Sequence, residues 1–323
     1  MRDVLAVGNA LVDVVADVDD AWLAANDVMK GAMTLVDEAR AEALYARVGP
    51  AVEVSGGSAA NTAAGLASLG GKAGFVGKVR DDQLGKIFRH DLTAQGVQFN
   101  TSAAKTGPAT GRCLSVVTPD AQRSMNTFLG ACENLTDEDI KDGEISQYRM
   151  VYLEGYPFDL PKPREALAKT MTLAKSHGVQ VALTLSDSWL IARHTPLFRD
   201  YLMMGIDVLF ANEQELMTLF PAADVQKAVA SARRHARLVV CTQSEKGAIV
   251  SAAEETLHSP AERVSHVVDT TGAGDMFAAG FLFGLCQNMP LPKAARVGHL
   301  CASHIIQHHG ARPKMALSAL LAV

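Results

Sequence analysis

The chain has 323 residues and a formal net charge of −5 at pH 7. Hydrophobic residues make up 48% and charged residues 20%, which is typical of a globular protein and excludes disorder and fibrous repeats. The acidic balance argues against a nucleic-acid-binding surface.

The apolar runs and the cysteines bear on location. The first apolar run is soon followed by acidic residues, unlike the centre of a secretion signal, and the longest, residues 276–286, is too short to span a bilayer. We therefore expect a cytoplasmic protein with no membrane partner. The cysteines are odd in number and lack Cys-x-x-Cys spacing, which indicates neither a disulfide framework nor a zinc site, so we expect burial of Cys113, Cys132, Cys241, Cys286 and Cys301.

Short β-branched runs alternate with longer stretches of helical period. This order predicts an α/β protein with a doubly wound, mainly parallel sheet covered by helices on both faces. In chain order, we expect strands at residues 4–7, 73–76, 150–153, 179–184, 208–211, 238–242 and 247–251. Helices are expected at residues 61–69, 85–95, 163–177, 213–219, 225–235, 275–287 and 292–308.

Two regions interrupt the alternation, at about residues 13–37 and 110–129. The second is predicted to form two strands around the turn Thr118-Pro119-Asp120-Ala121. We expect one domain over residues 1–323, with a small β-sheet lid formed by these two insertions. A lid that excludes water would suit group transfer.

The most informative stretch is Gly272-Ala273-Gly274-Asp275, which lies just before an apolar helix. Two glycines let backbone amides approach an anion, and the helix N-terminus directs its unsatisfied N–H groups to the same point. A carboxylate there could take a proton from an attacking hydroxyl. Asp275 could equally be a helix cap, and taken alone the two interpretations are even.

A second stretch, from Gly56 and Gly57 to Asn61, opens a helix of small residues. The glycine amides and Asn61, in the first helical turn, would face the same opening, which is suited to hydroxyls or an anion. Tight helix–sheet packing explains the alanines but does not need both glycines and Asn61, so we favour a binding role. No Walker-type loop or three-glycine dinucleotide fingerprint is found.

Asn9 and Asp13 follow the first strand, at the edge where doubly wound sheets bind ligands. An amide and a carboxylate match a vicinal diol. A solvated acidic turn explains Asp13 equally well.

Together, Gly56-Gly57 with Asn61 and the run from Asp269 to Asp275 resemble the two signatures of the ribokinase (PfkB) family of carbohydrate and nucleoside kinases. The resemblance extends over nearly the whole chain and implies a ribokinase-like fold. The adenosine kinase branch is favoured by four segments, at residues 8–13, 123–131, 207–215 and 295–303. The chain departs from that branch at Ala10, where proline is frequent, and in a lid that lacks an obvious second aromatic residue.

The resemblance implies roles for the site residues. Asp275 matches the catalytic base, and the amides of Gly272, Ala273 and Gly274 match the anion hole. On the acceptor side, ribose hydroxyls would be held by Asn9, Asp13, Gly56, Gly57 and Asn61. Asn212 and Glu215 match an Asn-x-x-Glu element that organises hydrated Mg²⁺ and the ATP phosphates, and Arg123 matches a lid arginine that closes on phosphate.

Further contacts follow from the same resemblance. Thr242, Ser244 and Gly247 resemble the loop that contacts the ATP phosphates and ribose, whereas His299 and Ser303 would border the ATP adenine. Tyr156 is the first candidate for stacking on a substrate purine and Phe128 the second, although core packing explains Tyr156 equally well. The resemblance also leaves open a monovalent cation, such as K⁺, near Asp269 and Thr271.

These residues predict an ATP- and Mg²⁺-dependent kinase that phosphorylates the 5′-hydroxyl of adenosine to give AMP and ADP. The nearest alternatives are a sugar kinase of the same fold, acting on ribose, fructose or a related acid, and a guanosine or inosine kinase. A non-catalytic nucleoside-binding protein is an alternative of another class, though Asp275 and both glycines are intact. The chain could be a monomer or a homodimer, since a lid can be a free flap or a dimer surface.

Overall fold

The computed structural model describes residues 1–120, 122–253 and 255–322. In this part of the chain nine strands form the larger sheet, in the order β14-β13-β12-β11-β10-β9-β1-β5-β6. Neighbours from β6 to β12 run parallel, whereas β13 and β14 are antiparallel. Its strands are β1 (Arg2–Val7), β5 (Ala73–Val76), β6 (Gln98–Phe99), β9 (Tyr148–Leu153), β10 (Gln180–Thr184), β11 (Ile206–Asn212), β12 (Ala236–Thr242), β13 (Ala248–Ser251) and β14 (Thr256–Ser259).

Alternating side chains of the buried strands build a hydrophobic core on each face of this sheet. Val4 and Ala6 of β1 pack into one core, and Leu5 and Val7 into the other. The first core is closed by α3 (Ser58–Ser68), α4 (Gln83–Ala94), α10 (Ala273–Cys286) and α11 (Leu291–Ile305). The second is closed by α5 (Asp142–Ile145), α6 (Pro161–Ser176), α7 (Ser188–Met203), α8 (Glu213–Leu219) and α9 (Val225–Ala232).

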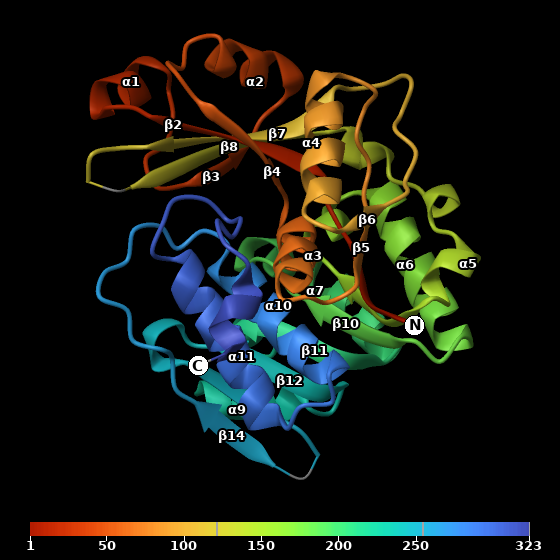
Figure 1. Ribbon diagram of the computed structural model, residues 1–323. Coiled ribbons are helices and arrows are strands. Elements are labelled where there is room, and N and C mark those ends of the chain that lie inside the picture. The colour runs from red at the N-terminus through yellow and green to blue at the C-terminus, as the bar shows by residue number, and fades with distance from the viewer. Residues whose placement is uncertain (121, 254, 323) are drawn as a thin grey trace.

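A second, smaller sheet lies at one end of the molecule, with two helices on its outer side (Figure 1). In the described residues its order is β3-β8-β7-β2-β4, from β2 (Leu11–Asp17), β3 (Met33–Leu35), β4 (Val52–Gly56), β7 (Thr110–Val117) and β8 (Arg123–Gly130). Helices α1 (Asp20–Ala25) and α2 (Glu38–Tyr45) contribute Leu23 and Leu44 to its own small core. The predicted fold class, a doubly wound sheet with a small second sheet, is confirmed.

Several elements differ from the sequence-based expectation. The second sheet also takes in β4, which lies beyond the predicted insertions and begins at the exposed Val52. The helix α7 was not expected, because Pro196 interrupts its sequence pattern. In the structure the helix is kinked near this proline, where His194 has non-helical backbone angles. The predicted hairpin of β7 and β8 is antiparallel as expected, while Ala121 of its turn lies outside the described residues.

Short 3-10 turns complete the chain, at η1 (Ala131–Asn134), η2 (Asp137–Asp139), η3 (Tyr156–Asp159), η4 (Ser244–Lys246) and η5 (Leu317–Ala322). The five cysteines are buried and free, as expected. Among the described residues, no helix combines the length and the apolar character needed to cross a bilayer.

Glycine lets α10 and α11 approach closely. A Cβ on Gly280 would stand 2.6 Å from the carbonyl oxygen of Val297, so Gly280→Ala must push the helices apart. We expect a loss of about 1–3 kcal/mol in the free energy of unfolding, measured by urea denaturation. The matched control is Gly143→Ala in α5, where a Cβ meets nothing within 4 Å. Equal stability of the two variants would contradict the close approach.

Candidate active site

Asp275 is held by two side chains of α3. Gly272 has φ 76° and caps α10, which begins at Ala273, so Asp275 lies in the first helical turn, and the helix starts two residues earlier than expected. Ser58 Oγ donates to Asp275 Oδ1 at 2.6 Å, and Asn61 Nδ2 donates to Oδ2 at 2.8 Å. Burial raises the pKa of Asp275, while both hydrogen bonds and the charge of Arg312 oppose that rise. The carboxylate is therefore fixed in place with its basicity raised.

The amides beside this carboxylate form an open donor group. Among the described residues, the N–H groups of Gly272, Gly274 and Asp275 have no hydrogen-bond acceptor. Gly274 is exposed, and a Cβ on it would meet nothing within 4 Å. The Ala273 amide instead donates to the Thr270 carbonyl at 3.2 Å, which corrects the predicted set, because this bond forms as the chain enters the helix. The remaining three can meet an anion.

The predicted acceptor-side residues converge on the same place. Gly57 has φ 91°, and a Cβ there would lie 2.2 Å from the Asn9 carbonyl oxygen. A Cβ on Gly56 would lie 2.5 Å from the Asp13 carboxyl group. Both glycines are thus required by close packing. Asn61 Oδ1 is buried and, within the described chain, has no hydrogen-bond partner, which leaves an acceptor for a hydroxyl. Burial raises the pKa of Asp13 to about 6.

Glu154 is a site residue that the sequence analysis missed. It follows β9, is 1% exposed, and accepts hydrogen bonds from the amides of Ala59 (2.8 Å) and Asn9 (3.4 Å). Burial raises its pKa to about 8, so it is mostly protonated at neutral pH. By joining the start of α3 to the end of β1, it fixes the two segments that carry Asn61 and Asn9. A charged residue directly after a buried strand was the available signal.

Ser58 and Arg312 were also missed. Ser58 directly follows the glycine pair, a position from which a helix-opening hydroxyl can reach a ligand or a neighbouring carboxylate. Arg312 is 7% exposed and donates from Nε to the Ser55 carbonyl and from Nη1 to the Ala60 carbonyl, both at 2.9 Å. Nothing in the sequence near Arg312 signalled burial.

A cavity of about 230 Å³ opens in front of Asp275. Thr184, Asn212 and Thr242 line it, and each is the last residue of its strand, so the cavity lies at the carboxyl ends of β10, β11 and β12. Ligands bind at this edge in doubly wound sheets. Six of the predicted residues line it, namely Tyr156, Asn212, Glu215, Thr242, Gly274 and Asp275.

Asn212 and Glu215 form a reciprocal helix cap. Asn212 Oδ1 accepts from the Glu215 amide at 2.8 Å, and Glu215 Oε2 accepts from the Asn212 amide at 3.0 Å. Burial raises the pKa of Glu215 to about 7. Within the described residues no cluster of three or more His, Cys, Asp or Glu could hold a metal directly. One carboxylate and one amide facing the cavity fit a hydrated Mg²⁺ held through water.

Arg123 reaches across from the second sheet to the segment that precedes Gly272. Its Nε donates to Ser115 Oγ at 2.8 Å, and its Nη1 contacts Asp269 Oδ2 at 3.3 Å and Thr271 Oγ1. Asp269 also accepts from the amides of Thr271 and Gly310, both at 2.9 Å. Burial raises the pKa of Asp269, but these hydrogen bonds and Arg123 outweigh it and lower the value. Both carboxylate oxygens of Asp269 therefore already have donors, and a monovalent cation near Asp269 and Thr271 stays a prediction.

The predicted nucleotide-side residues other than Thr242 lie outside the cavity lining among the described residues. Gly247 has φ 100°, and a Cβ on it would lie 2.0 Å from the Ser259 carbonyl, so it serves the turn between β12 and β13; Ser244 precedes it in η4. His299 is buried against Phe277 at 4.9 Å between ring centroids, and burial lowers its pKa. Ser303 Oγ donates to the Leu300 carbonyl at 2.9 Å. None of these four lines the cavity in the described structure.

The two aromatic candidates differ in position. Tyr156 lines the cavity, with its hydroxyl 3.4 Å from the Ser186 carbonyl. Phe128 is 7% exposed within β8 and is not among the described residues that line the cavity. Tyr156 is therefore the better placed of the two.

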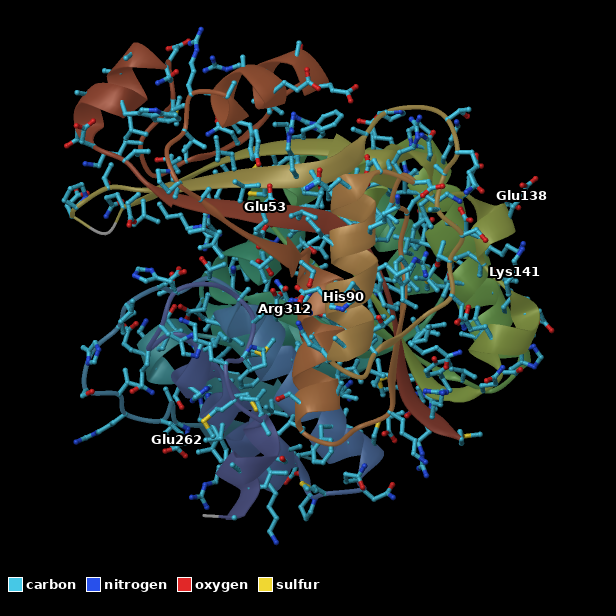
Figure 2. All side chains as sticks on the ribbon, turned by 45° about the horizontal axis from the view of Figure 1, so that its top comes forward. Glu53, His90, Glu138, Lys141, Glu262 and Arg312 are labelled. Carbon is cyan, nitrogen blue, oxygen red and sulfur yellow. The ribbon has the colours of Figure 1, made fainter. Side chains whose placement is uncertain are left out.

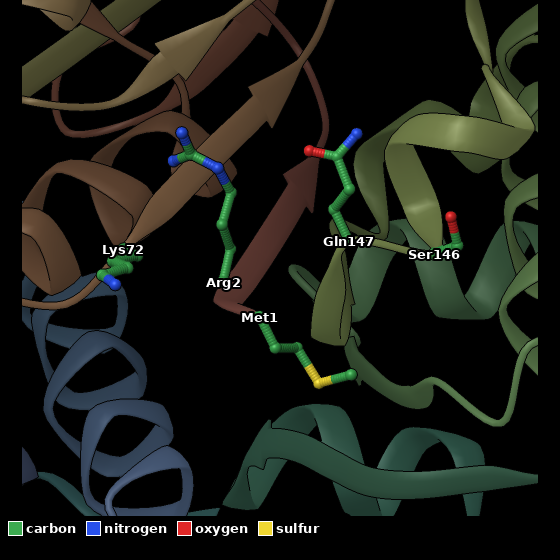
Figure 3. Close-up of a pocket in the computed structure, with 5 residues that line it drawn as sticks. All are labelled: Met1, Arg2, Lys72, Ser146 and Gln147. Carbon is green, nitrogen blue, oxygen red and sulfur yellow. The ribbon is translucent and has the colours of Figure 1, made fainter.

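A second depression lies at the amino-terminal ends of the strands, lined by Met1, Arg2, Lys72, Ser146 and Gln147 (Figure 3). No carboxylate is among the described residues that line it. Because parallel sheets bind ligands at the opposite edge, the site is at Asp275.

The chain belongs to the pfkB family of carbohydrate kinases, whose family model matches residues 1–317. The fold and the site thus define a kinase that phosphorylates a hydroxyl group of a small molecule. A structure of adenosine kinase from Sinorhizobium meliloti is 44% identical, covers 99% of this chain and 98% of that one, and superposes with a TM-score of 0.93. A probable sugar kinase from Rhizobium etli CFN 42 is 43% identical, with 99% and 98% covered and a TM-score of 0.93. The 5-dehydro-2-deoxygluconokinase of Geobacillus thermodenitrificans is 29% identical over 80% of each chain.

The raised pKa of Glu154 predicts a pH effect on stability. Its value is about 8 in the fold against an ordinary 4.5, so the folded protein binds the extra proton. The stability due to that proton is full below pH 4.5 and is lost as the pH rises toward about 8. Glu154→Gln stays neutral at every pH. The melting temperature of this variant relative to that of the wild type should therefore increase as the pH rises from about 5 to 8.

The control for this experiment is Glu138→Gln, at an exposed residue on η2 (Figure 2). Its melting temperature should follow that of the wild type at every pH. A constant difference between Glu154→Gln and the wild type would contradict the raised pKa.

Proposed function

We propose that this chain is an ATP- and Mg²⁺-dependent kinase that transfers the terminal phosphoryl group of ATP to the 5′-hydroxyl of adenosine, giving AMP and ADP. The observation that carries this proposal is the Asp275 carboxylate, which lines a cavity, is fixed by Ser58 and Asn61, and lies beside three amides that have no acceptor among the described residues. A base and an anion cradle at one point are what in-line phosphoryl transfer needs.

In the proposed reaction, Asp275 accepts the proton of the attacking hydroxyl. The amides of Gly272, Gly274 and Asp275 offset the charge on the transferred group, an effect commonly worth several kcal/mol. Asn61 Oδ1, buried and unpartnered among the described residues, accepts a hydrogen bond from the acceptor's sugar ring. Asn9 and Asp13 hold a neighbouring pair of hydroxyls.

The ATP side is assigned to Asn212, Glu215 and the end of β12. Mg²⁺, when bound, neutralises charge on the ATP phosphates. Asn212 and Glu215 orient its water shell, because both are held rigid by their reciprocal cap at the cavity wall. Arg123, which joins the second sheet to the anion loop through Asp269, is assigned the contact with a phosphate.

Adenosine is favoured as the acceptor by two observations. The Sinorhizobium meliloti relative, with 44% identity, is named an adenosine kinase. Tyr156 lines the cavity, where an aromatic ring can stack on a purine, a contact of about 1–3 kcal/mol in nucleic-acid systems.

A sugar or sugar acid is the second candidate for the acceptor. It is supported by the probable sugar kinase from Rhizobium etli and the 5-dehydro-2-deoxygluconokinase relatives. The carboxylate and amide groups around Asp275 suit hydroxyls of either acceptor, so the choice depends on the walls of the acceptor pocket.

The proposed role of Asp275 predicts the effect of Asp275→Asn, which keeps the size of the side chain but removes the base. The rate constant kcat should fall about 10²–10⁴-fold, measured by ATP consumption with the preferred acceptor. Asp17→Asn, at the exposed end of β2, should leave kcat unchanged. Near-normal turnover by purified, folded Asp275→Asn would rule out this mechanism.

The acceptor can be identified by comparing kcat/KM for adenosine, guanosine, inosine, ribose, fructose and 5-dehydro-2-deoxygluconate. We expect adenosine to exceed the free sugars and the sugar acid by at least about tenfold, since a stacked base adds contact that a sugar lacks. Turnover of a sugar or sugar acid without turnover of any nucleoside would refute the adenosine assignment and leave the kinase assignment intact.

A further inference from the structure

The buried guanidinium of Arg312 spans the loop that holds the acceptor-side residues. Arg312 lies after α11, between the second sheet and the helices of the larger sheet (Figure 2). Its Nε binds the carbonyl of Ser55, just before the glycine pair, and its Nη1 binds the carbonyl of Ala60, just before Asn61. These two hydrogen bonds flank Gly56 and Gly57 and fix the start of α3. They thereby position Ser58 and Asn61, which donate to Asp275.

The same segment also touches the anion loop. The Gly310 amide donates to Asp269 Oδ2 at 2.9 Å. A Cβ on Gly272 would lie 2.6 Å from the Cβ of Ala311, so the two residues are in close contact. Residues 310–312 therefore connect the loop that carries Asp275 to the loop that carries Ser58 and Asn61.

Arg312 is also a buried positive charge that acts on both carboxylates. Burial raises the pKa of Asp13 and of Asp275, and the charge of Arg312 acts against both rises. Burial lowers the pKa of Arg312 to about 10, which leaves it protonated at neutral pH. Arg123 acts on Asp13 more strongly than Arg312 does, but its guanidinium is bound to Asp269 and it is not among the influences on Asp275.

Among the described residues, the other groups that face these carboxylates supply no free positive charge, and Asp269, which acts on Asp13 as a negative charge, is paired with Arg123. Ser58 and Asn61 of α3 donate neutral hydrogen bonds to Asp275. Glu154, at the end of β9, is mostly protonated at neutral pH because burial raises its pKa to about 8. Asp91 of α4 accepts hydrogen bonds from the amide and hydroxyl of Ser55 and acts on Arg312 as a further negative charge.

We propose that Arg312 is a positioning residue for the phosphoryl transfer, which holds the Gly56–Gly57 loop against Asp275 and keeps Asp275 and Asp13 ionised as their buried counter-charge. This inference rests on the proposed role of Asp275 as the base. Within the described chain, Arg312 Nη2 is buried without a hydrogen-bond partner. A residue retained only as a loop clamp would satisfy its donors, whereas a counter-charge acts through space.

Arg89 provides a matched control for a purely structural role. It donates to the carbonyls of Phe99 at 2.7 Å and Thr101 at 2.5 Å, so it clamps a loop as Arg312 does. Its charge does not figure among the influences on Asp13 or Asp275. Arg89→Gln should therefore lower stability without altering the pH dependence of catalysis.

The test compares the pH profiles of kcat and kcat/KM for the wild type, Arg312→Lys, Arg312→Gln and Arg89→Gln. In Arg312→Gln the acid limb of the kcat profile, where Asp275 becomes protonated, should move to higher pH by about one unit. The value of kcat near pH 6 should then fall by about tenfold. Arg312→Lys keeps the charge but cannot bind both carbonyls, so its limb should stay in place while KM rises. Arg89→Gln should keep the limb and KM of the wild type.

An acid limb in Arg312→Gln that coincides with that of the wild type would overturn the proposal, as would equal shifts in Arg312→Lys and Arg312→Gln. If Arg312→Gln does not fold, the charge-balanced Asp91→Asn/Arg312→Gln takes its place under the same criteria. Asp275→Asn, measured alongside, separates the two failures. Its retained activity would refute the proposed base, whereas an inactive Asp275→Asn with an unmoved limb in Arg312→Gln would refute only the role of Arg312.

Discussion

The site depends on the meeting of two helix N-termini, α3 and α10, around one carboxylate. Ser58 and Asn61 are separated from Asp275 by 217 and 214 residues, yet both donate to it. The small residues of the two helices make this possible, since a Cβ on Gly65 of α3 would lie 2.8 Å from Ala279 and Met276 of α10. Close packing of these helices aims their first turns at a shared space, where an anion and a hydroxyl can be brought together.

The same packing creates an electrostatic cost. Asp13, Asp275 and Glu154 lie together in a region where burial raises the pKa of each. The chain offsets this with amides of helix starts, with hydroxyl and amide side chains, and with the guanidinium of Arg312. Glu154 and Asp275 respond differently, because Glu154 is closed off at 1% exposure whereas Asp275 opens onto the cavity. One serves as a fixed link and the other remains free to react.

The relatives are named as kinases of different acceptors, although they share one fold. The adenosine kinase and the probable sugar kinase superpose on the chain equally well, which is expected when the phosphoryl-transfer apparatus is common to a family and the acceptor pocket is not. The glycine loops and Asp275 could be found in the sequence because their chemistry demands particular residues in a short span. Tyr156 was ranked before Phe128 only through the family resemblance, because an aromatic ring in a core looks the same in sequence as one at a binding site. The tertiary structure separates them by position, with Tyr156 at the cavity and Phe128 within β8.

By itself the sequence determined the alternation of strands and helices, the two glycine loops and Asp275, since each is a local pattern with a local physical cause. The tertiary structure decided which distant groups meet. Ser58 on Asp275, Glu154 on the amides of Ala59 and Asn9, and Arg312 across the glycine loop depend on contacts between segments far apart in the chain. No periodicity or motif encodes such contacts, because burial and the partners of a polar side chain are properties of the packed molecule.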